Sequence, residues 1–278
     1  MLNKMKIDIL NNIINNNLIN NNLINNLKIY VINNIINDIV NNLIYIGIYL
    51  SIWVNANYFS NLIINNNYYI FYISEYIYWL FASFCLIFNE LNIDEWRVAK
   101  KIKGQINEKD IFPIIVRNHI LLGLFFFIYN YFYPPAIENI STNIFIFSFK
   151  IIVFIILYEI IYYTIHRIIH HGLFYKYIHK MHHQTYANIG MSGYYMGCID
   201  FFCEFIIPFF LPLYFTGNDP LVALTLGMIG QLYNINSHSG YNFPLMPYDN
   251  SHLIHHTNIK YNYSTLFMDH IFNTNYPK

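Results

Sequence analysis

The sequence predicts an all-α fold: a multispanning membrane helix bundle of about four spans plus a re-entrant or transmembrane hairpin, with a cytosolic histidine-rich di-metal cap. The 278 residues are 56% hydrophobic and only 11% charged, which is too little charge to cover a soluble globule of this size. Long apolar runs recur along the chain, and most of the 12 histidines follow the ends of such runs. Lys+Arg and Asp+Glu balance at 15 each, so no net charge attracts nucleic acid.

Apolar runs that are long enough to cross or nearly cross a bilayer predict the spans. They lie at about 39–54, 68–88, 118–133 and 143–165, and a further pair lies at 203–215 and 221–235. Pro208 and Pro212 interrupt the first member of this pair. The pair is therefore predicted either to cross the membrane twice or to dip into it and return.

Residues 1–37 are predicted to be a low-complexity segment that precedes one membrane domain at 38–278. The segment is rich in Asn and Ile. The spacing of its apolar pairs does not keep them on one face of a helix. Biased composition of this kind needs no function, and we assign none to it.

The loop between the second and third apolar runs sets the predicted orientation. It holds a group of basic residues: Arg97, Lys100, Lys101, Lys103 and Lys109. Short loops rich in Lys and Arg remain cytosolic. Counting crossings from this loop places the histidine-rich segments that follow residues 165 and 235 on the same, cytosolic side of the membrane.

Nine histidines form the candidate metal site. They are His166 and His170, then His179, His182 and His183, then His238, and finally His252, His255 and His256. Residues three or four apart share a helical face, so each cluster directs two or three imidazoles at one point. Neutral imidazole suits Fe, Zn, Cu and Ni, and nine such ligands exceed what one ion can use. The pattern predicts two metal ions, whereas His119, His171 and His270 are predicted to be structural.

The order and spacing of these clusters resemble the sterol desaturase / fatty acid hydroxylase superfamily of membrane di-iron enzymes. The resemblance covers about residues 115–275 and rests on the segments HRIIH, LFYKYIHKMHH, HSGYNFP and HLIHH. The segment HHQTYANIGMSGYYMGCIDFF looks most like the cholesterol 25-hydroxylase branch. Sterol C4-methyl oxidases and C5-desaturases usually carry a His-Pro pair where this chain has Gly197-Cys198.

The third histidine cluster departs from the pattern of this superfamily. The usual His-His-Asp-x-His-His is replaced by SHLIHH at 251–256, so the leading His and the Asp are missing. An Asp at this place would orient an imidazole, and loss of such a partner weakens metal binding about 10- to 100-fold. Asp249 is the predicted substitute. Glu159 matches an acidic residue that is usual seven positions before the first cluster, and it is predicted to support the ligand His166.

The resemblance implies an oxygenase that hydroxylates or desaturates a sterol or other lipid at an unactivated C–H bond, which no side chain can attack by itself. It implies two iron ions, with zinc as an alternative in purified protein, and O2. Electrons would come from cytochrome b5 or its NAD(P)H-dependent reductase, at an endoplasmic reticulum-type membrane. The substrate would enter sideways from the bilayer, with Tyr194, Tyr195 and Tyr241 as candidate polar contacts.

Several functions stay open at this point. The best match is a cholesterol 25-hydroxylase-like enzyme, and the nearest alternative is a C5-sterol desaturase or methylsterol oxidase-type enzyme on another lipid. A histidine-rich metal transporter would carry its imidazoles inside the spans instead of at their ends. A zinc protease is disfavoured because the sequence has no His-Glu-x-x-His. The altered third cluster leaves a decayed, non-catalytic metal-binding protein as the last alternative.

Overall fold

The structure is a computed structural model. It describes residues 42–55, 58–59, 68–91, 93, 95–99, 106–135, 140–141, 143–186, 189–244, 246, 250–264 and 267–277. The low-complexity segment predicted at 1–37 and the predicted supporting residue Asp249 both lie outside these ranges. The described residues are nearly all helical, and the only β pairing among them is one isolated bridge between Arg97 and Tyr241.

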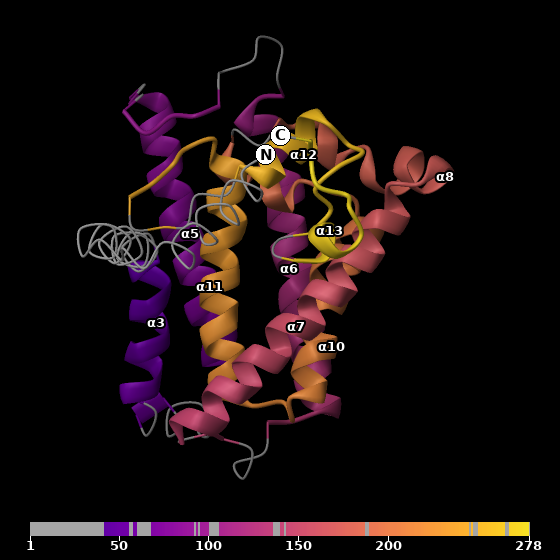
Figure 1. Cartoon of the computed structure of the whole chain (residues 1–278). Helices are drawn as coiled ribbons and strands as arrows, with labels where there is room; N and C mark the ends of the chain where they lie inside the picture. The colour runs from indigo at the N-terminus through magenta and orange to yellow at the C-terminus, as the bar shows by residue number, and fades with distance from the viewer. Residues whose placement is uncertain are drawn as a thin grey trace, which may run out of the picture.

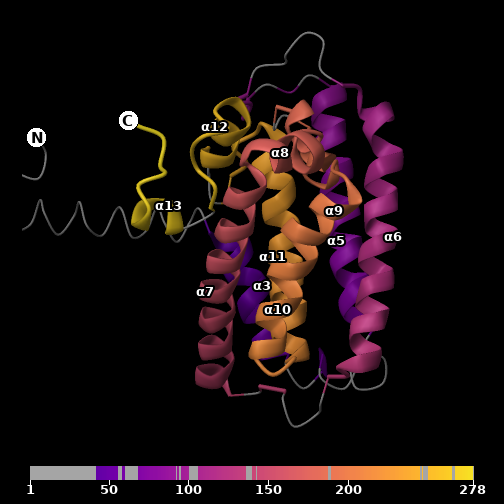
Figure 2. The same ribbon diagram turned by 90° about the vertical axis from the view of Figure 1, so that its right-hand side faces the viewer.

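The predicted membrane bundle is confirmed. The main helices are α3 (Leu43–Val54), α5 (Tyr69–Glu90), α6 (Glu108–Phe132), α7 (Ile144–Ile169), α10 (Ile207–Phe215) and α11 (Pro220–Ser239). α3, α5, α6, α10 and α11 run roughly along the long axis of the molecule (Figure 1, Figure 2), and α7 crosses at a slant in the view of Figure 1. Among the described residues, four segments are long and apolar enough to cross a membrane: Tyr69–Glu90, Glu108–Phe132, Ile144–Ile169 and Cys198–Phe215.

The predicted hairpin at 203–235 has two helical limbs. The first limb is continuous from α9 (Cys198–Phe201) through the π-helical turn η5 (Phe202–Ile206) into α10. It packs against α7, and residues 216–219 then connect it to α11. Pro208 lies in the first turn of α10, directly after the π-helical turn, and it has no N–H to donate to a carbonyl of that turn.

Helix α11 is the central element of the bundle. It packs against α5, α3 and the 3-10 turn η4 (Gly190–Tyr194), and most of its side chains are buried. Gly193 allows η4 to approach closely, because a Cβ at this position would lie only 2.0 Å from Oδ1 of Asn234. Because Gly193 has no side chain, the loop that follows the second histidine cluster can pack directly against Asn234, near the end of α11.

Two capping residues fix the ends of these helices that lie away from the histidines. The Asn143 side chain accepts hydrogen bonds from the backbone amides of Phe145 (2.9 Å) and Ile146 (3.4 Å), which begins α7. Asp219 caps α11 by accepting from Leu221 N (3.0 Å), and it also pairs with Lys150 Nζ at 2.8 Å. These bonds tie the start of α7 to the start of α11.

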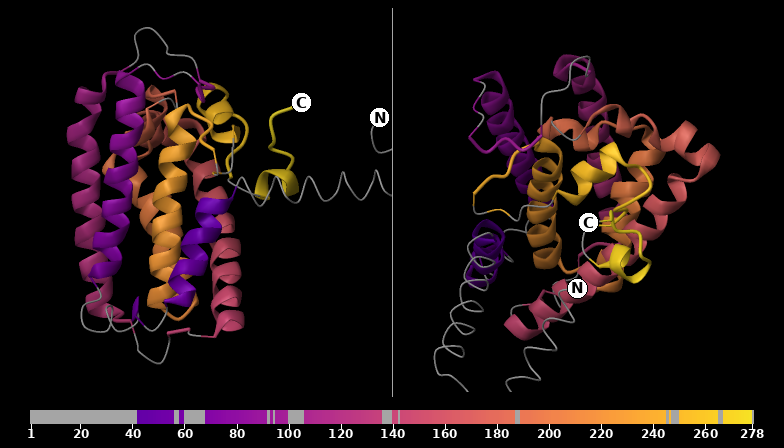
Figure 3. Two further views of the ribbon diagram at one scale, coloured as in Figure 1. Left: turned by 90° about the vertical axis from the view of Figure 1, so that its left-hand side faces the viewer. Right: turned by 45° about the horizontal axis from the view of Figure 1, so that its top comes forward.

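The histidine-bearing segments meet at the opposite end of the bundle. The C-terminal ends of α7 and α11 lie there, beside α8 (Gly172–Phe174), η2 (Tyr175–His179), η3 (His182–Gln184) and α12 (Ser251–Thr257) (Figure 1, Figure 3). The short helix α13 (Met268–Ile271) packs against α7. The chain therefore brings segments that are about 90 residues apart in sequence to one end of an apolar bundle.

Candidate metal centre

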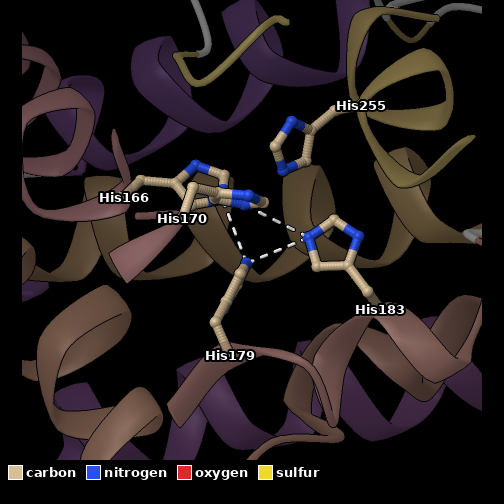
Figure 4. A group of neighbouring side chains, drawn as sticks. All are labelled: His166, His170, His179, His183 and His255. Atoms are coloured by element: carbon tan, nitrogen blue, oxygen red, sulfur yellow. Dashed lines mark hydrogen bonds between the residues drawn. The ribbon is translucent and has the colours of Figure 1, made fainter. Parts of the chain in front are cut away.

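The structure brings all nine predicted histidines together in two groups. The five-histidine group is His166, His170, His179, His183 and His255, and the four-histidine group is His182, His238, His252 and His256. Within each group, the atoms that could bind a metal lie within 4.8 Å of one another. Figure 4 shows the five rings of the first group turned toward one common point.

The sequence clusters are divided between these groups. His182 and His183 are neighbours in η3, and successive side chains of a 3-10 helix point about 120° apart. Consequently His182 joins the four-histidine group and His183 joins the five-histidine group. The groups adjoin each other, because the ring centroids of His183 and His256 are 4.6 Å apart.

Most rings are held in place through Nδ1. The backbone carbonyl partners are Tyr263 for His166 (2.8 Å), Asn234 for His238 (2.8 Å), Tyr261 for His255 (2.7 Å) and Thr185 for His256 (2.7 Å). His179 donates from Nδ1 to the carboxylate of Asp200 at 3.0 Å. Because carbonyls and carboxylates only accept, Nδ1 carries the proton in these five rings, and Nε2 faces the group with a free lone pair.

The arrangement of the Nε2 atoms fits a bound metal. His166 Nε2 and His179 Nε2 are 3.2 Å apart, although both rings already use their proton at Nδ1. Two lone pairs facing each other at this distance repel, and a cation bound by both removes the repulsion. Two nitrogens bound to one ion at about 2.1 Å and a right angle would be about 3.0 Å apart, which agrees with the observed spacing.

His255 offers a further test of this fit. Its ring is fully buried, and its Nε2 has no hydrogen-bond partner among the described residues. A buried polar nitrogen without a partner is costly, unless it serves as a ligand. The donor atoms of the five-histidine group therefore match what an imidazole-bound ion requires. The Nε2 atoms of the four-histidine group are spaced alike, with His252 at 2.8 Å from His238 and 3.1 Å from His256.

Burial keeps these imidazoles neutral. Desolvation lowers the pKa of His179, His182, His183, His252 and His256 well below the usual 6.5, with the neighbouring imidazoles acting in the same direction. For His255, burial lowers the pKa to about 4. Neutral rings are ready to bind metal without first releasing a proton.

Comparison with known proteins agrees with this geometry. Residues 151–274 match the fatty acid hydroxylase family. This segment contains all nine histidines of the two groups. No curated protein and no solved structure matches the chain. The match supports the superfamily that the motifs predict, whose activity is that of a membrane oxidoreductase acting on lipids.

Two acidic residues that the sequence analysis did not single out support candidate ligands of this centre. Asp200 accepts the Nδ1 proton of His179, as described above. Asp269 accepts hydrogen bonds from the backbone amides of Tyr263 (3.0 Å) and Ser264 (2.6 Å). It thereby holds the loop whose carbonyls orient His166 and His255. Asp200 does have a sequence signal, since it is an acidic residue within an otherwise apolar run.

The predicted supporting residue Glu159 contacts the same C-terminal segment. Its Oε1 accepts hydrogen bonds from the backbone amides of Phe267 (2.9 Å) and Met268 (3.3 Å), and the side chain is fully buried. Glu159 thus anchors the segment next to Asp269. That Glu159 supports His166 stays a prediction. Glu159 would act through this C-terminal segment, because the carbonyl of Tyr263 accepts from His166.

The three tyrosines that were predicted to contact substrate lie in different surroundings. The hydroxyl of Tyr194 donates to Gln231 Oε1 (2.9 Å), and that of Tyr195 donates to Gln184 Oε1 (3.1 Å), next to His183. The Tyr241 hydroxyl donates to Asn89 Oδ1 (3.1 Å), and Arg97 lies over its ring. Tyr241 therefore joins the end of α11 to the basic loop. The substrate contacts stay predictions.

Replacement of Asp269 by alanine is expected to destabilise the protein by about 1–3 kcal/mol, because it removes the acceptor of the partly buried backbone amides of Tyr263 and Ser264. Iron affinity is expected to fall about 10- to 100-fold, since the carbonyls that orient two ligands lose their support. Melting temperature in mild detergent and iron per chain measure the two effects. The control is Asp110→Ala, which removes an exposed acidic residue of α6. Unchanged iron affinity in Asp269→Ala would contradict the orienting role.

Proposed function

We propose that this chain is a membrane non-heme di-iron oxygenase that hydroxylates or desaturates a sterol or related lipid, most closely a cholesterol 25-hydroxylase-like sterol hydroxylase. The observation that carries the proposal is the division of nine histidines into two adjoining groups at one end of an apolar helix bundle. A soluble or peptide substrate would not require such a position, whereas a lipid in the bilayer would reach it directly.

The nine histidines would hold the two ions through their inward-facing nitrogens. Bound iron would supply the dioxygen and one-electron chemistry that side chains lack. The protein's own contribution is positional: the Nδ1 hydrogen bonds fix each ring, and burial of the rings excludes water. Zinc could occupy the same donors in purified protein, because imidazole also binds zinc.

The substrate is proposed to approach from within the bilayer. α7 and α10 belong to the apolar segments 143–165 and 203–235, they pack against each other, and they are proposed to line this path. The oxygenase would receive electrons from cytochrome b5 or its NAD(P)H-dependent reductase. The histidine-bearing end is proposed to face the cytosol in an endoplasmic reticulum-type membrane, because Arg97 hydrogen-bonds to Tyr241, which follows the C-terminal end of α11.

The alternatives differ in how they account for this geometry. A C5-sterol desaturase or methylsterol oxidase-type enzyme would use the same centre with another lipid. A metal transporter is disfavoured because His166 lies in the last turn of α7 and the other ligands lie at or beyond helix ends. A decayed protein is disfavoured because both groups retain their facing nitrogens despite the altered third cluster.

Cells that express the chain are expected to accumulate oxysterols, and the purified protein is expected to hold about two iron ions per chain. Lipid profiling of the cells, with oxysterols searched first, tests the expected product. Metal analysis after purification in mild detergent tests the expected iron content. Cells that express His182→Ala are the control. Less than about half an ion per chain would favour a decayed, non-catalytic protein.

A further inference from the structure

Glu204 is a buried carboxylate that the ligand set described above does not use. It lies in η5, within the membrane-spanning segment Cys198–Phe215, and only 3% of its surface is exposed. An acidic side chain within a membrane span is costly, and it is retained where it meets a cation, a proton path or another polar partner. The contacts of Glu204 show which of these applies.

The Oε1 atom of Glu204 faces the five-histidine group. It lies 3.3 Å from Nε2 of His166 and 3.7 Å from Nδ1 of His179, and it accepts no hydrogen bond from any described residue. His166 cannot supply a proton at Nε2, because its Nδ1 proton is already donated to the carbonyl of Tyr263. When Glu204 is ionised, an oxygen lone pair and a nitrogen lone pair therefore face each other, and a proton on Glu204 or a cation bound by both atoms removes their repulsion.

Asp200 provides the contrast within the same segment. It precedes Glu204 by four residues, so both carboxylates lie on one helical face. Asp200 is satisfied by the Nδ1 proton of His179, at 3.0 and 3.1 Å to its two oxygens. The potential ligand atoms of His179, Asp200 and Glu204 all lie within 4.8 Å of one another. Two buried carboxylates this close repel unless one of them keeps a proton or a cation lies beside them.

The spacing of Glu204 matches that of a further donor for the same ion. Two donors bound to one ion at about 2.1 Å and a right angle would be about 3.0 Å apart, close to the 3.3 Å between Oε1 and His166 Nε2. Among the described residues, no carboxylate belongs to the four-histidine group. The acidic residues therefore lie on one side of the two-group centre.

We propose that Glu204 supplies a carboxylate oxygen to the ion of the five-histidine group, an inference that rests on the proposed function. This ion then has mixed imidazole and carboxylate donors, a set that suits ferrous iron, whereas the ion of the four-histidine group has imidazole donors alone. The negative charge of Glu204 offsets part of the charge of its ion in a medium of low dielectric constant. The two ions are consequently held with different affinity.

The test is the iron affinity of Glu204→Gln, which keeps the size of the side chain and removes its charge. We expect one of the two ions to bind about 10- to 100-fold more weakly in competition with a chelator, while the other ion keeps its wild-type affinity. Mössbauer spectra of the ferrous protein are expected to change for one site only. Glu75→Gln is the matched control, because Glu75 is an acidic residue of a span that contacts His119 and Trp79.

Two results would overturn the inference. Wild-type affinity for both ions in Glu204→Gln, with unchanged spectra, would show that Glu204 is not a donor. An equal loss at both sites would show general structural damage. If Glu204→Gln does not insert into the membrane, Glu204→Asp takes its place. A Mössbauer spectrum of Glu204→Asp that is altered at one iron site supports the inference, and an unaltered spectrum rejects it. Absence of iron from the wild-type protein would reject the proposed function itself.

Discussion

Replacement of His182 by alanine is expected to remove iron and activity together while the protein remains inserted in the membrane. His182 is buried in η3, and its Nε2 lies 3.4 Å from Nε2 of His238. Its ring centroid is also 4.7 Å from that of His256. Loss of a partner that only orients a ligand weakens metal binding up to about 100-fold, so loss of the ligand itself is expected to exceed this figure.

His171→Ala is the matched control for this experiment. His171 lies in the same histidine-rich segment, but it is exposed and belongs to neither group. This variant is expected to keep wild-type iron content and wild-type product formation. Iron per chain, oxysterol yield and membrane fractionation compare the two variants with the wild-type protein. Full activity in His182→Ala would rule out its role as a ligand.

The parts of this centre that follow from local spacing could be predicted from the sequence. Histidines three or four apart on helical turns share a face, so the nine candidates could be chosen without knowledge of the fold. The apolar runs likewise predicted the membrane segments, because burial in lipid requires continuous hydrophobic residues. The structure places all nine candidates in the two groups.

The division into groups could not be predicted, because it depends on how distant segments cross. His182 and His183 are adjacent in sequence, yet they belong to different groups. His166 and His255 join one group only because the loop around Asp269 folds back against α7. Sequence spacing contains no information on these long-range contacts.

Helix limits were also only partly predictable. The third apolar run was predicted to begin at residue 118, but α6 begins at Glu108. Glu108–Asp110 are polar, and Arg117 separates the apolar residues 111–116 from the run at 118–133, so hydropathy alone does not join them into one helix. Asn118 is buried where its amide donates to the carbonyls of Tyr194 (2.8 Å) and Met196 (3.0 Å). These tertiary bonds allow a polar residue inside the helix.

A fall in pH from about 7.5 to about 5.5 is expected to destabilise the metal-free protein steeply. In the folded state, burial holds the pKa of His182, His183, His252 and His256 well below 6.5 and that of His255 at about 4. In the unfolded chain these residues return to the ordinary pKa near 6.5. At about pH 7.5 and above these histidines are almost entirely neutral in both states, so they make the free energy of unfolding nearly independent of pH.

Below pH 6.5 the unfolded chain takes up protons that the folded chain refuses, so the free energy of unfolding falls as the pH falls. By one unit below the ordinary pKa, each such histidine lowers it by about 1.4 kcal/mol. Five histidines acting together then remove about 7 kcal/mol, which is comparable with the whole stability of many proteins. Melting temperature in mild detergent measures this loss.

Iron should shift this acid transition to lower pH, because a bound ion keeps its imidazoles neutral until protons displace it. The iron-loaded protein is therefore expected to hold its melting temperature below pH 6.5 and then to lose stability and iron together. Since each released imidazole takes up a proton, iron loss should depend steeply on pH. Identical profiles with and without iron would mean that these histidines do not bind it. A flat profile in the metal-free protein would instead mean that they are not buried as neutral rings.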